Sequence, residues 1–137
     1  MRKNHLNHKL RAYNLQEILI VLAIIGILLL LALPRLMPLI SKTKSLEAQT
    51  QLKQIYNMQT TFRYMHSKYS LDFDEIDFEA PNTVNQNGTA NYSYEITEAT
   101  GSTFKAVATA VVDFDGDGVF NIWEIDQNGN PKQVVKD

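Results

Sequence analysis

Residues 18–33 form the longest apolar run of the chain, contain no charge, and follow directly on Glu17. Sixteen residues fall short of the roughly 20 that an α-helix needs to cross a bilayer, but extension past Arg35 to Ile40 brings the run into range. Arg35 can extend its charged end to the membrane surface or pair with an opposite charge. A carboxylate at the edge of a membrane-spanning segment is expensive to desolvate, so Glu17 is predicted to have a functional partner.

Beyond this run, apolar residues recur every three or four positions, which predicts an amphipathic continuation of the same helix to about His66. The predicted stripe consists of Ala48, Leu52, Ile55, Met58, Phe62 and Met65. One long helix from about Asn14 to His66 is therefore expected. Gly26 and Pro34 weaken its apolar half, so we expect the helix to bend or melt locally between them.

The last part of the chain changes to the alternating pattern of strands. Alternation predicts strands around residues 92–96, 104–110, 119–125 and 133–135, separated by turns that contain glycine or asparagine. The fold class is therefore α+β, with the long helix packed on an antiparallel sheet of three or four strands. Residues 71–79 are interpreted as a solvated acidic segment with its apolar side chains turned inward, namely Leu71, Phe73, Ile76 and Phe78.

The first 12 residues are basic: they contain Arg2, Lys3, Lys9 and Arg11, and no acid precedes Glu17. Such a segment stays cytoplasmic. No A-x-A cleavage pattern follows the apolar run, so that run is predicted to be retained. The expected organisation is a leader at 1–12, a membrane stem at 13–40 and a soluble head at 41–137.

The run from Ala12 to Gly26 resembles the class III signal of type IV pilins and of type II secretion pseudopilins. The resemblance implies cleavage between Ala12 and Tyr13 by a prepilin peptidase, N-methylation of Tyr13, and a ladle-shaped pilin fold. Glu17 is then fifth in the mature chain, and Gly26 and Pro34 match the helix-weakening residues of the family. Two positions depart from the family pattern, because Ala12 stands where glycine is usual and Tyr13 where phenylalanine or methionine is.

The resemblance also implies partners and a location. The subunit would sit in the inner membrane with its leader in the cytoplasm, and an assembly platform there would add it to a filament of identical or related pilin subunits. The Glu17 carboxylate would pair with the new Tyr13 ammonium of a neighbouring subunit. The main competitor is a major pseudopilin of type II secretion, although this chain lacks the W-G-N-P-Y type segment of that group. A membrane-anchored calcium-binding module that does not assemble is a third hypothesis.

Composition agrees with a structural role. Without the leader, nine basic and 15 acidic residues remain, a net charge of about −6 with neutral histidines. An acidic surface repels phosphate, which argues against direct nucleic-acid binding. His66 is the only histidine left and the chain has no cysteine, so nothing in the sequence suggests an enzyme.

The segment from Asp113 to Glu124 fits the spacing of an EF-hand loop, D-x-D-x-D-G followed by five residues and glutamate. The residues on either side of the turn have the pattern of strands rather than of helices. If they pair as a hairpin, Glu124 lies roughly 20 Å from the turn, so a full EF-hand loop is excluded. Two interpretations stay open: Ca²⁺ held by some of Asp113, Asp115 and Asp117, or an acidic turn alone. The segment also resembles the acidic turn and W-x-I-D strand near the end of many pilins.

Two tripeptides match the N-glycosylation sequon, Asn87-Gly88-Thr89 and Asn91-Tyr92-Ser93. The pattern is common by chance, and the sequence alone assigns it no function.

Overall fold

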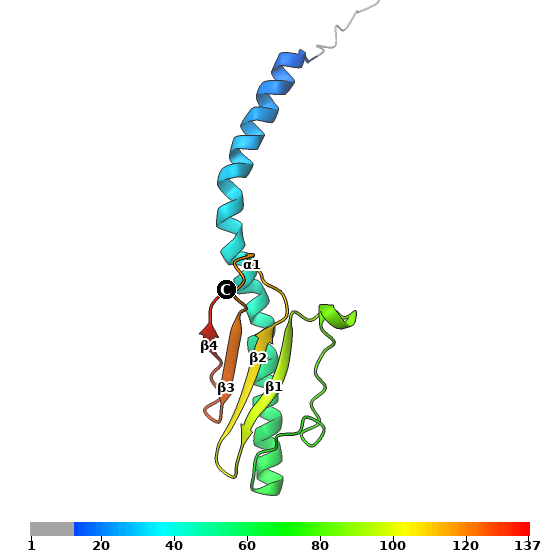
Figure 1. The fold of residues 1–137 in the computed structure, drawn as a ribbon, viewed down its shortest axis with the longest axis vertical. Helices are drawn as coiled ribbons and strands as arrows, with labels where there is room; N and C mark the ends of the chain where they lie inside the picture. The colour runs from blue at the N-terminus through cyan, green and yellow to red at the C-terminus, as the bar shows by residue number, and fades with distance from the viewer. Residues whose placement is uncertain (1–12) are drawn as a thin grey trace, which may run out of the picture. The chain divides into compact units, whose positions relative to one another are not determined.

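The computed structural model describes residues 13–137 (Figure 1). Its contacts divide the chain into two units, one ending at Leu36 and one comprising Met37–Asp137. Helix α1, Leu15–His66, begins in the first unit and ends in the second. It is followed by a short 3-10 helix, η1 (Val84–Gln86), and by four strands: β1 (Tyr92–Ala99), β2 (Phe104–Ala110), β3 (Ile122–Asp126) and β4 (Lys132–Val135).

In the first unit, every described side chain is exposed. Helix α1 contains one segment that is long and apolar enough to cross a membrane, and none of that segment is buried. The helix is continuous through Gly26 and Pro34. The expectation of local melting between these residues is therefore wrong for this structure. Pro34 removes one N–H donor from the helix, but the helical backbone continues on both sides of it. A bend there stays a prediction.

In the second unit, the four strands form one antiparallel sheet in the order β1-β2-β3-β4, a simple meander (Figure 1). Tyr94 of β1 pairs with Ala108 of β2, and Ala108 pairs in turn with Trp123 of β3. This register places the buried positions of neighbouring strands on the same face. The predicted α+β fold, a long helix on a four-stranded antiparallel sheet, is confirmed.

The core lies between α1 and the inner face of the sheet. Ala48, Leu52 and Ile55 of α1 are fully buried, as are Ala106 and Ala108 of β2. Alanines on the central strand allow the helix backbone to approach the sheet closely. The predicted stripe is wrong at its last position, because Met65 is 68% exposed. Gln59, which the hydrophobic pattern left out, is instead fully buried.

The segment after α1 packs on the edge of β1. Phe78 is buried and makes an edge-to-face contact with Tyr94, with ring centroids 6.2 Å apart. Ile76 is also buried and Phe73 is partly buried against the core, as predicted. Leu71 is 62% exposed, so its predicted inward orientation is wrong. Its neighbour Ser70 is held inward by hydrogen bonds to Gln59, and the chain bends at Leu71, whose side chain is left on the surface.

Candidate functional sites

The first candidate site is the start of α1. Tyr13 is exposed and precedes the helix, and the backbone N–H of Asn14 donates to Glu17 Oε2 over 3.2 Å. Because α1 begins at Leu15, Asn14 occupies the N-cap and Glu17 the third helical position. This contact is one half of a capping box. Glu17 therefore has a local structural role as well as an exposed carboxylate. Ala12 lies outside the described residues.

The stem carries no partner for its apolar surface within the described residues. Large aliphatic side chains from Leu15 to Ile40 are exposed over about half of their area or more. Such a surface needs lipid or protein around it. Gly26 lies on this surface with open space where a Cβ would be.

The second candidate site is the loop between β2 and β3, which is built by its aspartates. Asp113 accepts backbone N–H bonds from Gly116 and Gly118, both at 2.7 Å. These hydrogen bonds stabilise the carboxylate, so the pKa of Asp113 lies below its usual value, with Gly118 the larger cause. Asp115 and Asp117 each accept from the backbone two residues further on. Gly116 and Gly118 have φ values of +83° and +86°, which favour glycine.

A fourth carboxylate joins the three predicted ones. Asp137 accepts the backbone N–H of Phe114 at 2.9 Å through Oδ2. Asp113, Asp115, Asp117 and Asp137 can each present one oxygen so that all four atoms lie within 4.8 Å of one another. Oxygen ligands about 2.4 Å from a calcium ion are at most about 4.8 Å apart, so the spacing fits one ion. Asp137 Oδ1 is buried without a hydrogen-bond partner among the described residues, which leaves it free to act as a ligand.

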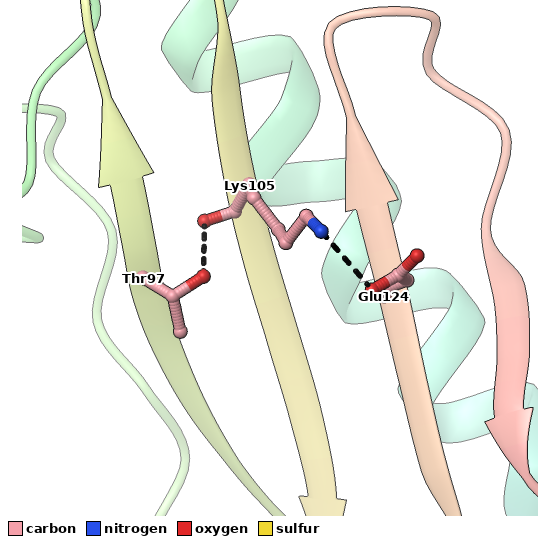
Figure 2. Close-up of polar contacts among 3 residues, drawn as sticks. All are labelled: Thr97, Lys105 and Glu124. Atoms are coloured by element: carbon pink, nitrogen blue, oxygen red, sulfur yellow. Dashed lines mark hydrogen bonds and ion pairs between the residues drawn. The ribbon is translucent and has the colours of Figure 1, made fainter.

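Glu124, the last position of the EF-hand pattern, is not part of this cluster. It lies on β3 opposite Val107 of β2, and its Oε2 is 3.6 Å from Lys105 Nζ (Figure 2). Figure 2 also shows Thr97 of β1 donating to the Lys105 carbonyl. Val107 lies between the buried Ala106 and Ala108, so Glu124 opposite it belongs to the outer face of the sheet. The prediction that strand pairing excludes a full EF-hand loop is confirmed.

The aspartate loop is attached to α1 by contacts that no local pattern indicated. Lys44 Nζ lies 4.9 Å from the centre of the Phe114 ring and donates to Asn91 Oδ1. Ser41 Oγ donates to the Asp137 carbonyl at 3.0 Å. Asp137 itself was not predicted, because it is 20 residues from Asp117 in sequence and joins the cluster only through the packing of the fold.

No protein-family model matches the chain. The type IV major pilin protein PilA of Myxococcus xanthus (strain DK1622) is 37% identical over 101 residues, which is 74% of this chain and 43% of that protein. The chain is a homologue of a type IV major pilin. This similarity confirms the predicted resemblance to type IV pilins, and the long apolar helix near the start of the described residues fits the pilin signal. The chain spans less than half the length of this relative.

Proposed function

We propose that this chain is a structural, non-enzymatic subunit of a type IV pilus or a related filament. The homology to a type IV major pilin carries the proposal, and the exposed apolar surface of the stem supports it. The precursor sits in the inner membrane with its leader in the cytoplasm and its head outside. A prepilin peptidase removes residues 1–12, and an inner-membrane platform adds the subunit to related pilin subunits in a surface filament.

Processing is tested by intact-mass analysis of the subunit in envelopes and in filaments sheared from the cell surface. The expected mature chain begins at N-methylated Tyr13. A subunit that still carries residues 1–12 would instead favour a simple membrane anchor.

Glu17 provides the test of assembly. Its carboxylate pairs with the Tyr13 ammonium of a neighbouring subunit, which offsets a desolvation cost of several kcal/mol per ion. Because Glu17 also caps α1, Glu17→Ala removes two interactions at once. Glu17→Gln is the sharper variant, since an amide oxygen can still accept the Asn14 N–H while the charge is lost.

The two variants should behave alike if the charge matters. Both should insert into the membrane and keep a folded head, but form few or no filaments by electron microscopy. Normal filaments from Glu17→Gln together with few from Glu17→Ala would assign the effect to helix capping and refute the ion pair.

A major pseudopilin of type II secretion is the second candidate, because that group shares the whole stem pattern. The W-x-I-D strand, Trp123–Asp126 within β3, favours a pilus subunit. Secretion assays on a deletion strain separate the two: lost surface filaments with normal secretion support the pilus, and lost secretion supports the pseudopilus.

We also propose that the aspartate cluster binds Ca²⁺. The four converging carboxylates and the unpartnered, buried Asp137 oxygen support this proposal. Binding to the folded state alone adds about 2.7 kcal/mol at a hundredfold excess over Kd. Residues 37–137 should melt higher in millimolar calcium than in chelator, and Asp115→Asn with Asp117→Asn should abolish the difference. Identical melting curves for the unmodified chain would leave an acidic turn that binds no calcium.

A further inference from the structure

The fold separates the two sequons of the chain. At the second, the Asn91 amide is already engaged: Nδ2 donates to Glu47 Oε2 at 2.9 Å, and Oδ1 accepts from Lys44 Nζ at 3.2 Å. The Asn91 backbone N–H also donates to Glu47 at 2.9 Å, and the following Tyr92 is fully buried. A sugar on Asn91 Nδ2 would break the contact with Glu47, so the folded head disfavours modification there.

The first sequon lies at the tip of a fixed turn. Residues 82–90 are closed by backbone hydrogen bonds from Ala90 to Asn82, from Val84 to Ala90 and from Gly88 to Thr83. A Cβ on Gly88 would lie 2.0 Å from the Asn82 carbonyl oxygen, so only glycine fits. Asn87 is exposed in the left-handed region with φ 61°, and Figure 1 shows η1 and this turn projecting beside β1.

Turn geometry accounts for the first two residues of this sequon but not for the third. Asparagine tolerates the left-handed backbone at position 87, and position 88 needs glycine because a Cβ there would clash with Asn82. The hydroxyls of Thr83 and Thr100 form hydrogen bonds within their own turns. The exposed Thr89 makes no side-chain hydrogen bond to the described part of the chain, and its hydroxyl is therefore available for the role that the sequon gives it.

We infer that Asn87 is the acceptor of an N-linked glycan. The amide Nδ2 of Asn87 forms a bond to C1 of a sugar carried by a glycosyl diphosphate donor, such as a lipid-linked one. The bond from C1 to the diphosphate oxygen breaks, the diphosphate leaves with its electron pair, and a base of the transferase takes one amide proton. The reaction requires that the head reaches the compartment of the transferase, as the proposed export provides.

The test uses the full chain isolated from its own cells, by intact-mass analysis and by fragmentation of the peptide containing Asn87. We expect added sugar mass on Asn87, lost in Asn87→Gly and in Thr89→Val but kept in Thr89→Ser. Glycine suits the positive φ at position 87, so the first variant should fold. Ser93→Ala removes the hydroxyl of the Asn91 sequon and is the matched control that should keep the sugar.

An unmodified Asn87 would overturn the inference, as would sugar found only on Asn91 or on a hydroxyl. The same spectra report the N-terminal residue. A chain that begins at Tyr13 but carries no sugar therefore refutes glycosylation and leaves the proposed pilus function standing.

Discussion

Gln59 offers the clearest test of how the head is held together. Its side chain is fully buried in α1 and makes two hydrogen bonds to one residue of the following segment. Nε2 donates to the Ser70 carbonyl at 2.6 Å, and Oε1 accepts the Ser70 backbone N–H at 3.0 Å. Gln59→Leu keeps a side chain of similar size but leaves both backbone groups of the buried Ser70 without these partners.

Each buried polar group left without a partner costs about 1–3 kcal/mol. Two such groups, partly offset by the added apolar surface, give an expected loss of about 2–4 kcal/mol. For a domain of about 100 residues this lowers Tm by roughly 8–32 °C, at about 4–8 °C per kcal/mol. The measurement is thermal and urea unfolding of residues 37–137, followed by circular dichroism.

Gln54→Leu is the matched control, because Gln54 lies on the exposed face of the same helix. Exposed substitutions of this kind change stability by about 0.5 kcal/mol or less. Equal melting temperatures for Gln59→Leu and Gln54→Leu would refute the reasoning. The amide of Ser70 should also exchange with solvent faster in Gln59→Leu.

Three further outcomes are expected for residues 37–137. Gly116→Ala should cost about 1–2 kcal/mol through its positive φ alone, whereas Gly129→Ala should cost more, because its Cβ would lie 2.7 Å from the Tyr56 ring; equal melting temperatures would contradict this. Burial raises the pKa of Tyr92 and Tyr94, so the folded head favours their neutral form. Their contribution to the free energy of unfolding should be fully present below pH 10 and fall above it, by up to about 1.4 kcal/mol per pH unit for each tyrosine. The melting temperature of the double variant Tyr92→Phe with Tyr94→Phe should fall less above pH 10 than that of the unmodified chain. Tyr94→Phe should be neutral or stabilising at pH 7, since the Tyr94 hydroxyl is buried without a partner among the described residues.

Short-range pattern was sufficient for most of the fold. Alternation located β1 and β2 and identified their buried face, because the side chains of a strand alternate between its two faces. The helical stripe identified Leu52 and Ile55 as core residues. It failed at Met65, since periodicity shows which face of a helix is apolar but not where the element that covers it ends.

The parts that sequence reasoning missed are polar and long-range. Gln59 lies within the apolar stripe but is polar, so the hydrophobic pattern does not include it, and its partner is a backbone segment 11 residues later. Asp137 joins the aspartate cluster from a distant part of the chain, and Glu47 holds the Asn91 amide from 44 residues earlier. A side chain that pairs with distant backbone leaves no periodic trace in a sequence.

These long-range contacts are made by polar side chains of α1. Ser41, Glu47, Lys53 and Gln59 each hold a different later part of the cysteine-free head, and Lys53 does so through a 2.7 Å bond to the Gly129 carbonyl. They are spaced six residues apart, which is about 9 Å along a helix axis. Contacts at that separation contribute almost independently to stability. Loss of the Gln59 contact should therefore weaken the head by its own share while the other three segments stay attached to the helix.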